Sequence, residues 1–433
     1  MKRDIYSQLL GWKKDEHRKP LILKGARQVG KTYILKEFGE SEYEDVAYFN
    51  FEEDPHLKEF FSQSLSPDVI LEKLSIARER IITPEETLII LDEIQESPEA
   101  LTSLKYFHES APEYHIIASG SLLGIKLGQD RSFPVGNVNM LFLYPFSFLE
   151  YLRGIGKSLI KDLIKEKQDF NAIDKKFHEE LIDDLKKFLY IGGMPEVIKR
   201  YKEEGDLQAA RNLQKEILEG YESDFAKHAS KTEAIKISHI WKTIPSQLAK
   251  ENKKFTFSEI QKHARPRDYN EAIEWLVSGG YIYKSYRVNI PNLPLDGYIE
   301  ENVFKLFMMD TGLLCAMLDL TPKTIVEGNS LFAQYNGAVT ENYIAQELIK
   351  NNFKNLYYWT SGSTAEVDFL VPYQERIYPL EVKSGKNAKA KSLQIYNKKY
   401  QPDFASRISP LNFNKVNELC DYPLYAISQF PIT

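Results

Sequence analysis

The sequence predicts an α/β protein of several domains, with a doubly covered parallel sheet near its N-terminus and a small mixed α/β module at its C-terminus. Three observations lead to this prediction. Short apolar runs alternate with amphipathic stretches over residues 1–150, and a glycine-rich turn joins the first run to a helical pattern. Helical apolar spacing then dominates residues 151–250. A chain of 433 residues allows about two to four domains of roughly 100–200 residues each.

Composition limits the classes of function. Hydrophobic residues make up 43% of the chain, and 62 acidic against 56 basic side chains give a net charge of −6. Such a chain has no global attraction for nucleic acid, so DNA binding would need local basic patches. The two cysteines, Cys315 and Cys420, indicate reduced thiols, and no signal peptide or apolar run of about 18 residues is visible. We expect a cytoplasmic protein without a membrane partner.

The first 150 residues carry five candidate strands with helical patterns between them. They are Pro20–Lys24, Asp45–Phe51, Thr87–Leu91, Tyr114–Ser119 and Asn139–Leu143. This alternation predicts a parallel sheet with helices on both faces. Ligands of such sheets bind at the carboxyl ends of the strands, where Gly25 and Asp92 fall.

A phosphate-binding pattern follows the first strand. The run fits G-x-x-x-x-G-K-S/T at every fixed position and reads Gly25-Ala26-Arg27-Gln28-Val29-Gly30-Lys31-Thr32. Its backbone amides would cradle the phosphates of ATP, with Lys31 on the β- and γ-phosphates and the Thr32 hydroxyl on Mg²⁺. The alternative is a structural strand–helix turn, which the complete match disfavours.

Two acidic residues end the third strand. Asp92 would hold the Mg²⁺ ion, and Glu93 would orient or deprotonate the attacking water. An Asp-Glu pair favours ATP hydrolysis over binding alone. On the fourth strand, Ser119-Gly120-Ser121 places a small hydroxyl near this edge. We expect Ser121 to contact the γ-phosphate, with a simple turn as the alternative.

Two further segments are predicted in the middle of the chain. Residues 151–250 form a helical lid, and residues 251–322 resemble a winged helix-turn-helix in their order of elements. In the second segment we expect helices over Phe255–His263 and Tyr269–Gly279, then strands over Tyr281–Val288 and Val303–Met309. Arg265 and Arg267 lie before the second helix, where they would contact DNA phosphates or form salt bridges within the domain.

Residues 323–433 predict a small mixed α/β module. A helix is expected near Tyr335–Lys350 and another near Ser392–Lys398. The expected strands are Leu356–Thr360, Glu366–Val371 and Tyr378–Lys383.

A possible metal site lies in this last segment. Asp368 and Glu381 sit on successive strands, Glu341 sits on the preceding helix, and together these three carboxylates would hold Mg²⁺. Lys383 would activate a water molecule for phosphodiester cleavage. The alternative is a charged strand with an ordinary surface Glu–Lys pair, and cleavage requires all four side chains to converge on one open pocket. Glu366 and Lys386 are interpreted as surface residues.

Several motifs together resemble a prokaryotic family that joins an AAA-type P-loop ATPase core to a C-terminal domain of unknown function with a restriction-endonuclease-like, PD-(D/E)xK, fold. The matching stretches are Pro20–Thr32, Leu91–Gln95, Ser119–Ser121, Tyr144–Phe148, Gly192–Glu196, Asp310–Leu314, Glu366–Phe369 and Glu381–Lys383. The resemblance implies an ATP-binding, ATP-hydrolysing protein and supplies no substrate.

These expectations combine into one functional hypothesis and one alternative. In the first, ATP hydrolysis moves the lid and the winged helix, and the C-terminal module binds or cuts nucleic acid. In the alternative, the chain is a nucleotide-gated switch or signalling ATPase with a protein partner and an inert nuclease-like scaffold. A homo-oligomer is compatible with both, and Arg131 and Arg153 are candidate arginine fingers.

Overall fold

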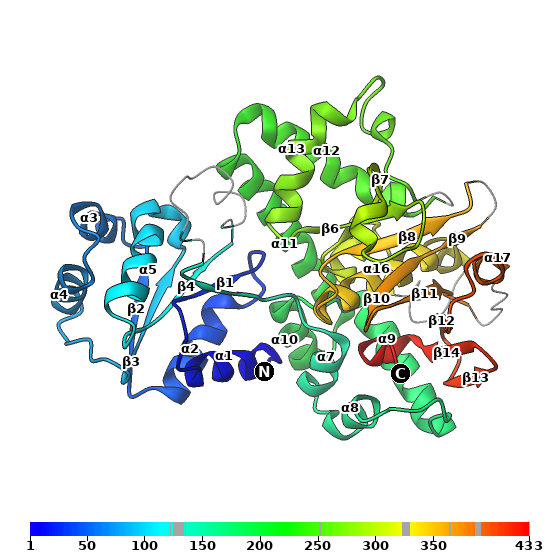
Figure 1. Ribbon diagram of the computed structural model, residues 1–433, viewed down its shortest axis with the longest axis horizontal. Helices are drawn as coiled ribbons and strands as arrows, with labels where there is room; N and C mark the ends of the chain where they lie inside the picture. Colours follow the sequence, from blue (N-terminus) through cyan, green and yellow to red (C-terminus); the bar gives the residue numbers. More distant parts are fainter. Residues whose placement is uncertain are drawn as a thin grey trace. The chain divides into compact units, whose positions relative to one another are not determined.

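The computed structural model describes residues 1–121, 123, 134, 136–250, 253–322, 330–362, 365–385 and 391–432 (Figure 1). The chain divides into two compact units. The first contains residues 1–144 and 278–280, and the second contains residues 145–277 and 281–433.

A five-stranded, all-parallel sheet forms the centre of the first unit. Its strands are β1 (Leu21–Lys24), β2 (Asp45–Asn50), β3 (Thr87–Asp92), β4 (His115–Gly120) and β5 (Asn139–Phe142). They run in the order β2-β3-β4-β1-β5. Each predicted strand is confirmed to within one residue at either end.

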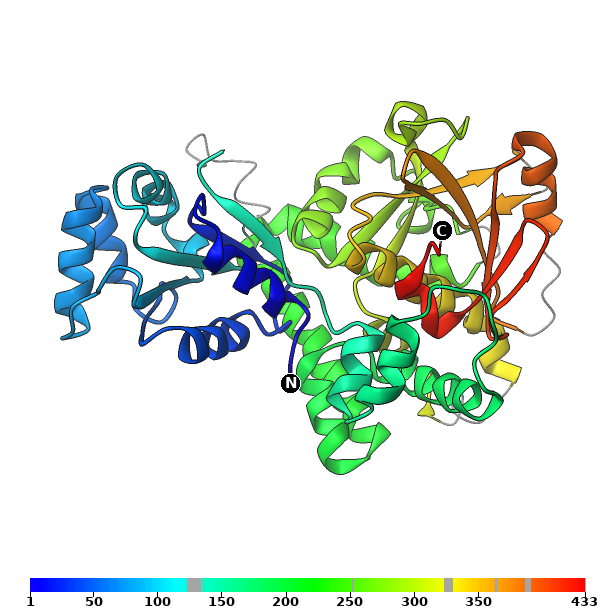
Figure 2. The same cartoon turned by 60° about the horizontal axis from the view of Figure 1, so that its bottom comes forward.

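Helices cover both faces of this sheet, as predicted (Figures 1 and 2). They are α1 (Ile5–Lys14), α2 (Lys31–Glu42), α3 (Leu57–Gln63), α4 (Pro67–Ala77) and α5 (Pro98–Ser110). Alternate residues of β3 face opposite layers, so Ile89 and Leu91 pack with α3, α4 and α5, while α2 contacts the sheet from its other side. The fully buried strands are typical of parallel sheets covered on both faces.

The strand order determines what meets at the carboxyl edge. Strand β4 lies between β1 and β3, with Leu23 opposite Ser119 and Leu91 opposite Ala118. The end of β4 is therefore flanked by the glycine-rich loop on one side and by Asp92 on the other.

The second unit opens with the predicted helical segment. Its helices are α7 (Phe148–Gly154), α8 (Ser158–Lys165), α9 (Lys175–Ile191), α10 (Pro195–Glu204), α11 (Leu207–His228) and α12 (Lys231–Leu248). Capping boxes at Ser147 and Ser230 start α7 and α12. Helix α9 ends at Gly192, and the next amide, of Gly193, donates to the carboxylate of buried Asp310.

The expected helix over Phe255–His263 is wrong. The amide of Phe255 donates to Phe304 O at 2.8 Å, which holds this residue extended beside a strand. Only a 3₁₀ turn, Phe257–Glu259, forms there. The following helix α13 (Pro266–Ser278) begins earlier than expected, because a proline is well suited to a first helical position.

Two sheets complete the second unit. The first has the order β7-β6-β8-β9 and comprises β6 (Ile282–Val288), β7 (Ile299–Met308), β8 (Leu356–Thr360) and β9 (Glu366–Val367). Strand β6 pairs antiparallel with β7 and parallel with β8, so strands from the segments on both sides of residue 322 share one sheet.

The second sheet has the order β10-β11-β12-β14-β13. Its strands are β10 (Phe369–Tyr373), β11 (Arg376–Val382), β12 (Ala405–Ser409), β13 (Asn414–Val416) and β14 (Leu419–Pro423). The remaining helices are α14 (Thr311–Met317), α16 (Ser330–Lys350) and α17 (Lys391–Tyr400). Helix α16 packs on β7, β8 and β11.

The expectation of one strand over Glu366–Val371 is wrong. Strand β9 pairs with β8 in one sheet, whereas β10 pairs with β11 in the other. Asp368 lies between them, where the chain passes from one sheet to the next. Among the helices that the structure describes, none is long and apolar enough to span a bilayer.

Candidate nucleotide site and C-terminal carboxylate cluster

The glycine-rich loop connects β1 to α2 through backbone conformations that favour glycine. Gly30, the N-cap of α2, has a left-handed φ of 94°. A Cβ at Gly25 would lie 2.3 Å from the carbonyl oxygen of Leu143, so no side chain fits there. Gly30 offers no side-chain oxygen to the first amides of α2, and these amides suit an anionic ligand.

Lys31 is buried at the start of α2. Its Nζ donates to Gly25 O at 2.9 Å and to Ala26 O at 3.0 Å. Burial lowers the pKa of Lys31 to about 8, although the carboxylates of Glu93 and Asp92 oppose this shift. The lysine thus lies against the loop that it would leave to meet a phosphate.

Asp92 is buried at the end of β3 and accepts several hydrogen bonds. Its Oδ2 accepts from Thr32 Oγ1 at 2.6 Å and from the Tyr48 hydroxyl at 3.0 Å. Its Oδ1 accepts from the Glu93 amide at 3.1 Å and from the Ser119 hydroxyl. The structure therefore brings together Thr32 and Asp92, which come from opposite sides of β4.

Two contacts of Asp92 were not expected. Ser119 contacts Asp92, and Ser121, the residue expected to contact the γ-phosphate, is buried just beyond the end of β4. Tyr48 was not predicted. It lies on β2, two residues before Asn50, and Asn50 is opposite Asp92 in the sheet. The polar residues at the carboxyl end of β2 could have indicated that this strand contributes a side chain to the site.

The oxygen atoms around Asp92 fit a magnesium ion. The Thr32 hydroxyl and the Asp92 carboxylate are neighbours on a sheet edge, and Mg²⁺ prefers a few such hard oxygen ligands supplemented by phosphate oxygens. These are the two residues for which the sequence predicts contact with Mg²⁺.

Glu93 follows Asp92 with a left-handed backbone, φ 51°. Its carboxylate oxygen Oε2 accepts a hydrogen bond of 2.5 Å from Gln95 Nε2.

Arg27 of the loop pairs with Glu52 at 3.2 Å. Among the arginine-finger candidates, Arg131 lies outside the described residues, and Arg153 lies in the last turn of α7.

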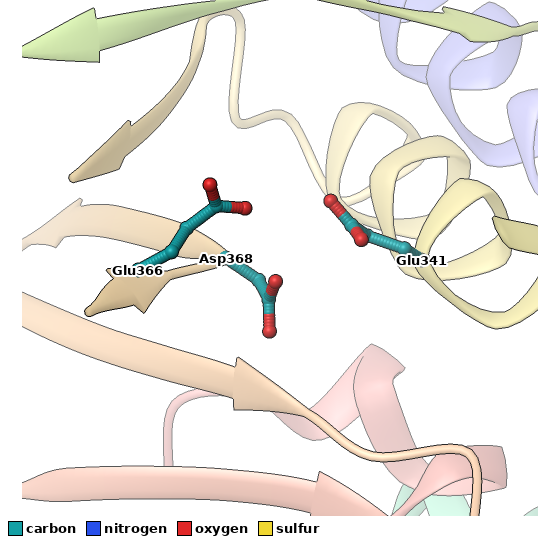
Figure 3. Close-up of side chains that lie close together, drawn as sticks. All are labelled: Glu341, Glu366 and Asp368. Atoms are coloured by element: carbon teal, nitrogen blue, oxygen red, sulfur yellow. The ribbon is translucent and has the colours of Figure 1, made fainter. Parts of the chain in front are cut away.

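A group of three carboxylates lies in the second unit. Glu341 of α16, Glu366 of β9 and Asp368 offer oxygen atoms that all lie within 4.8 Å of one another (Figure 3). The expectation that Glu366 is an ordinary surface residue is therefore wrong, and Lys386 lies outside the described residues. Strand β9 brings Glu366 to the group because it pairs with β8 rather than with β11.

Two lysines neutralise this group. The Nζ of Lys305, a fully buried residue of β7, donates to Glu341 at 2.7 Å and to Glu366 at 2.5 Å, and Lys253 pairs with the other oxygen of Glu341. Burial opposes the charged form of Lys305, but the carboxylates of Glu341, Glu366 and Asp368 raise its pKa. Burial and the charge of Glu341 raise the pKa of Asp368 to about 7.

Glu381 and Lys383 pair with each other outside this group. Glu381 Oε1 lies 2.6 Å from Lys383 Nζ, and its Oε2 accepts from the Leu393 amide of α17 at 3.2 Å. Asp368 Oδ2 accepts from the amide of Val382. Within the described residues, Glu381 does not join Glu341 and Asp368 in a metal-ligand group. This arrangement does not fit the predicted Mg²⁺ site, because ammonium groups already satisfy Glu341, Glu366 and Glu381.

Arg265 and Arg267 are exposed at the start of α13. The Nε atom of Arg267 lies 3.8 Å from an oxygen of its neighbour Asp268. Such a separated, exposed pair contributes little stability and leaves the arginine accessible to a phosphate.

Three family matches cover most of the chain. Residues 17–152 match an AAA domain, and residues 182–324 and 336–425 each match a domain of unknown function. A search of curated proteins gives no match.

Solved structures share only distant similarity with the chain. A Walker-type ATPase of Pyrococcus abyssi is 16% identical, with 73% of this chain and 95% of that one covered and a TM-score of 0.45. AMPPCP-bound DnaA from Aquifex aeolicus is 16% identical, with 64% and 85% covered and a TM-score of 0.27. The Drosophila ORC bound to DNA is 16% identical, with 75% and 94% covered and a TM-score of 0.28.

With identities and TM-scores this low, these likenesses identify neither the fold nor the function of the whole chain. The family match covers the glycine-rich loop, β3 and β4, which carry the site described above. The stretch that matches an AAA domain, residues 17–152, thus contains the whole parallel sheet and the glycine-rich loop.

Proposed function

We propose that the N-terminal domain binds ATP with Mg²⁺ and hydrolyses it to ADP and phosphate. The meeting of Thr32 Oγ1 and Asp92 Oδ2 at 2.6 Å, beside a lysine folded onto the glycine loop, carries this proposal. Thr32 lies in the first turn of α2 and Asp92 at the end of β3, and a purely structural turn has no need to bring them together.

Each residue has a role in this proposal. The amides of Gly25–Gly30 cradle the phosphates, and Lys31 neutralises charge on the β- and γ-phosphates. Thr32 and Asp92 would hold Mg²⁺, which would supply positive charge to offset the charge that develops during phosphoryl transfer. Glu93 is the general base for the attacking water, and the hydroxyl groups of Ser119 and Ser121 lie at the β4 edge toward the γ-phosphate.

ATP turnover in the Lys31→Ala variant tests the proposal. We expect the variant to lose phosphate release and to bind a fluorescent ATP analogue weakly. Lys14→Ala, which removes an exposed lysine of α1, is the matched control and should behave as wild type. Equal turnover in wild type and Lys31→Ala would refute the assigned site.

We further propose the domain division of the sequence analysis, with a helical lid, a winged helix and a C-terminal domain of PD-(D/E)xK type. Helix α13 and the antiparallel pair β6–β7 would supply the second helix and the wing strands of a winged helix, and the 3₁₀ turn Phe257–Glu259 stands where its first helix was expected. The C-terminal sheet beside α16 supports the last assignment. ATP turnover would move these parts.

For the C-terminal domain we favour a scaffold over an active nuclease. The buried Lys305 carries this choice, since its ammonium lies where Glu341 and Glu366 would share a metal ion. Burying such a set of charges is tolerable only when each charge has its partner.

A plasmid-nicking assay with Mg²⁺ or Mn²⁺ distinguishes the two candidates. A scaffold predicts no nicking by the wild-type protein in the presence or absence of ATP. Metal-dependent nicking that Asp368→Ala abolishes would restore the nuclease. DNA binding through Arg265 and Arg267 is compatible with either outcome, as is a homo-oligomer.

A further inference from the structure

The end of β4 contacts the two catalytic carboxylates in different ways. Ser119 donates directly to Asp92. The next residue, Gly120, lies against Gln95, whose amide donates to Glu93 at 2.5 Å. One strand end therefore reaches both Asp92 and Glu93, the second through a glutamine.

Gly120 is glycine for reasons of space. Its backbone φ is outside the left-handed range, so its conformation is open to any residue. A Cβ at this position, however, would lie only 2.0 Å from Gln95 Oε1, closer than atoms can approach. Any side chain at position 120 must move the buried amide of Gln95 from its place.

The orientation of Gln95 determines where the Glu93 carboxylate points. The chain turns sharply after β3, with Glu93 in a left-handed conformation and a 3₁₀ turn over Ile94–Glu96. The Gln95 amide occupies Oε2 of Glu93 and leaves Oε1 for a water molecule. A neutral amide donor orients a carboxylate without adding a charge to the site.

We propose that Gln95 is a positioning residue for ATP hydrolysis and that Gly120 provides the space in which it acts. This inference rests on the proposed hydrolysis. As the water oxygen bonds to the γ-phosphorus and the bond to the ADP oxygen breaks, Glu93 Oε1 accepts the water proton. Gln95, bonded to Oε2, holds the carboxylate so that Oε1 stays directed at the water, and misplacement of such a group by about 1 Å can cost up to 100-fold in rate.

A double-mutant cycle tests the proposal. Gln95→Ala and Gly120→Ala should each lower kcat by about 10- to 100-fold while the KM for ATP stays unchanged, because both remove the positioning of Glu93. The double variant should be no slower than Gln95→Ala alone, since truncation removes the 2.0 Å contact with Gln95 Oε1 and leaves the added methyl only the side chain of Leu123, at 3.0 Å. Gly11→Ala in α1, where an added Cβ meets nothing within 4 Å, is the control and should match wild type.

Two results would overturn the inference. One is an unchanged kcat in Gln95→Ala, and the other is independent, multiplicative losses in the double variant. Should wild type bind ATP without hydrolysing it, the proposed function fails separately. Unfolding temperatures then test the contact between positions 120 and 95. Gly120→Ala must lower the Tm of wild type by more than it lowers that of Gln95→Ala, in which only Leu123 remains close to the added methyl. Equal losses in both backgrounds would reject the contact.

Discussion

The affinity of the wild-type protein for ATP should fall as the pH rises past the pKa of Lys31. In the free domain, burial lowers this pKa to about 8. Phosphate binding requires the ammonium form and restores a high pKa, so binding above this pH takes up a proton. The sign follows directly: alkaline conditions oppose binding, because the lysine must first be protonated.

The magnitude follows from the same value. With a pKa of about 8, about nine-tenths of Lys31 is protonated near pH 7 and about one-tenth near pH 9. The Kd for ATP should therefore rise about 10-fold across this interval, which corresponds to about 1.4 kcal/mol. An exposed lysine with its ordinary pKa would produce almost no change.

Fluorescence anisotropy of a labelled, slowly hydrolysed ATP analogue measures this effect over that pH range. Lys31→Arg is the matched control, because a guanidinium stays charged throughout and ionisation of the nucleotide is common to both proteins. Proton uptake near pH 8.5, measured by calorimetry in buffers of different ionisation enthalpy, gives a second readout. Parallel pH profiles for the two proteins, with no proton uptake by wild type, would refute the reasoning.

Three further predictions concern other parts of the chain. Glu93→Gln should keep its affinity for ATP and lose about 10²- to 10⁴-fold in kcat, as phosphate release measures; unchanged turnover would exclude Glu93 as the base. Asp310→Ala leaves two buried amides without an acceptor and should cost about 2–6 kcal/mol in denaturant unfolding, whereas Asp183→Ala, at an exposed ion pair of α9, should cost under about 1 kcal/mol. Replacing Arg265 and Arg267 by alanine should weaken DNA binding and reduce its salt slope by about 2, and an unchanged slope would exclude them as phosphate contacts.

The C-terminal carboxylates show where the spacing of residues in the sequence fails to predict which side chains lie together. The spacing of Asp368, Glu381 and Lys383 suggests that they converge, because alternate residues of paired strands share a face. In the structure the chain changes sheets at Asp368, and Glu381 binds Lys383 and the start of α17. Lys305 lies some sixty residues before Glu366 in the sequence, and nothing in its neighbouring residues indicates that the two side chains pair.

At the N-terminal site, the residues predicted from the sequence agree more closely with the contacts in the structure. Thr32 and Asp92 were predictable, since a strand–turn–helix motif and a strand-ending acid bring them to one edge of any parallel sheet. The contact between Ser119 and Asp92 was not predictable, because it depends on the register of β4 against β3. Tyr48 likewise contacts Asp92 only through the pairing of β2 with β3.

By itself, the sequence determined the parallel sheet, the glycine loop and the acidic strand end, because each is encoded by residues that are neighbours in the chain. The tertiary structure alone decided which side chains complete the two sites. It placed Gln95 in the space left by Gly120, and Lys305 between Glu341 and Glu366. These contacts depend on how strands from distant segments align, and no local pattern records that alignment.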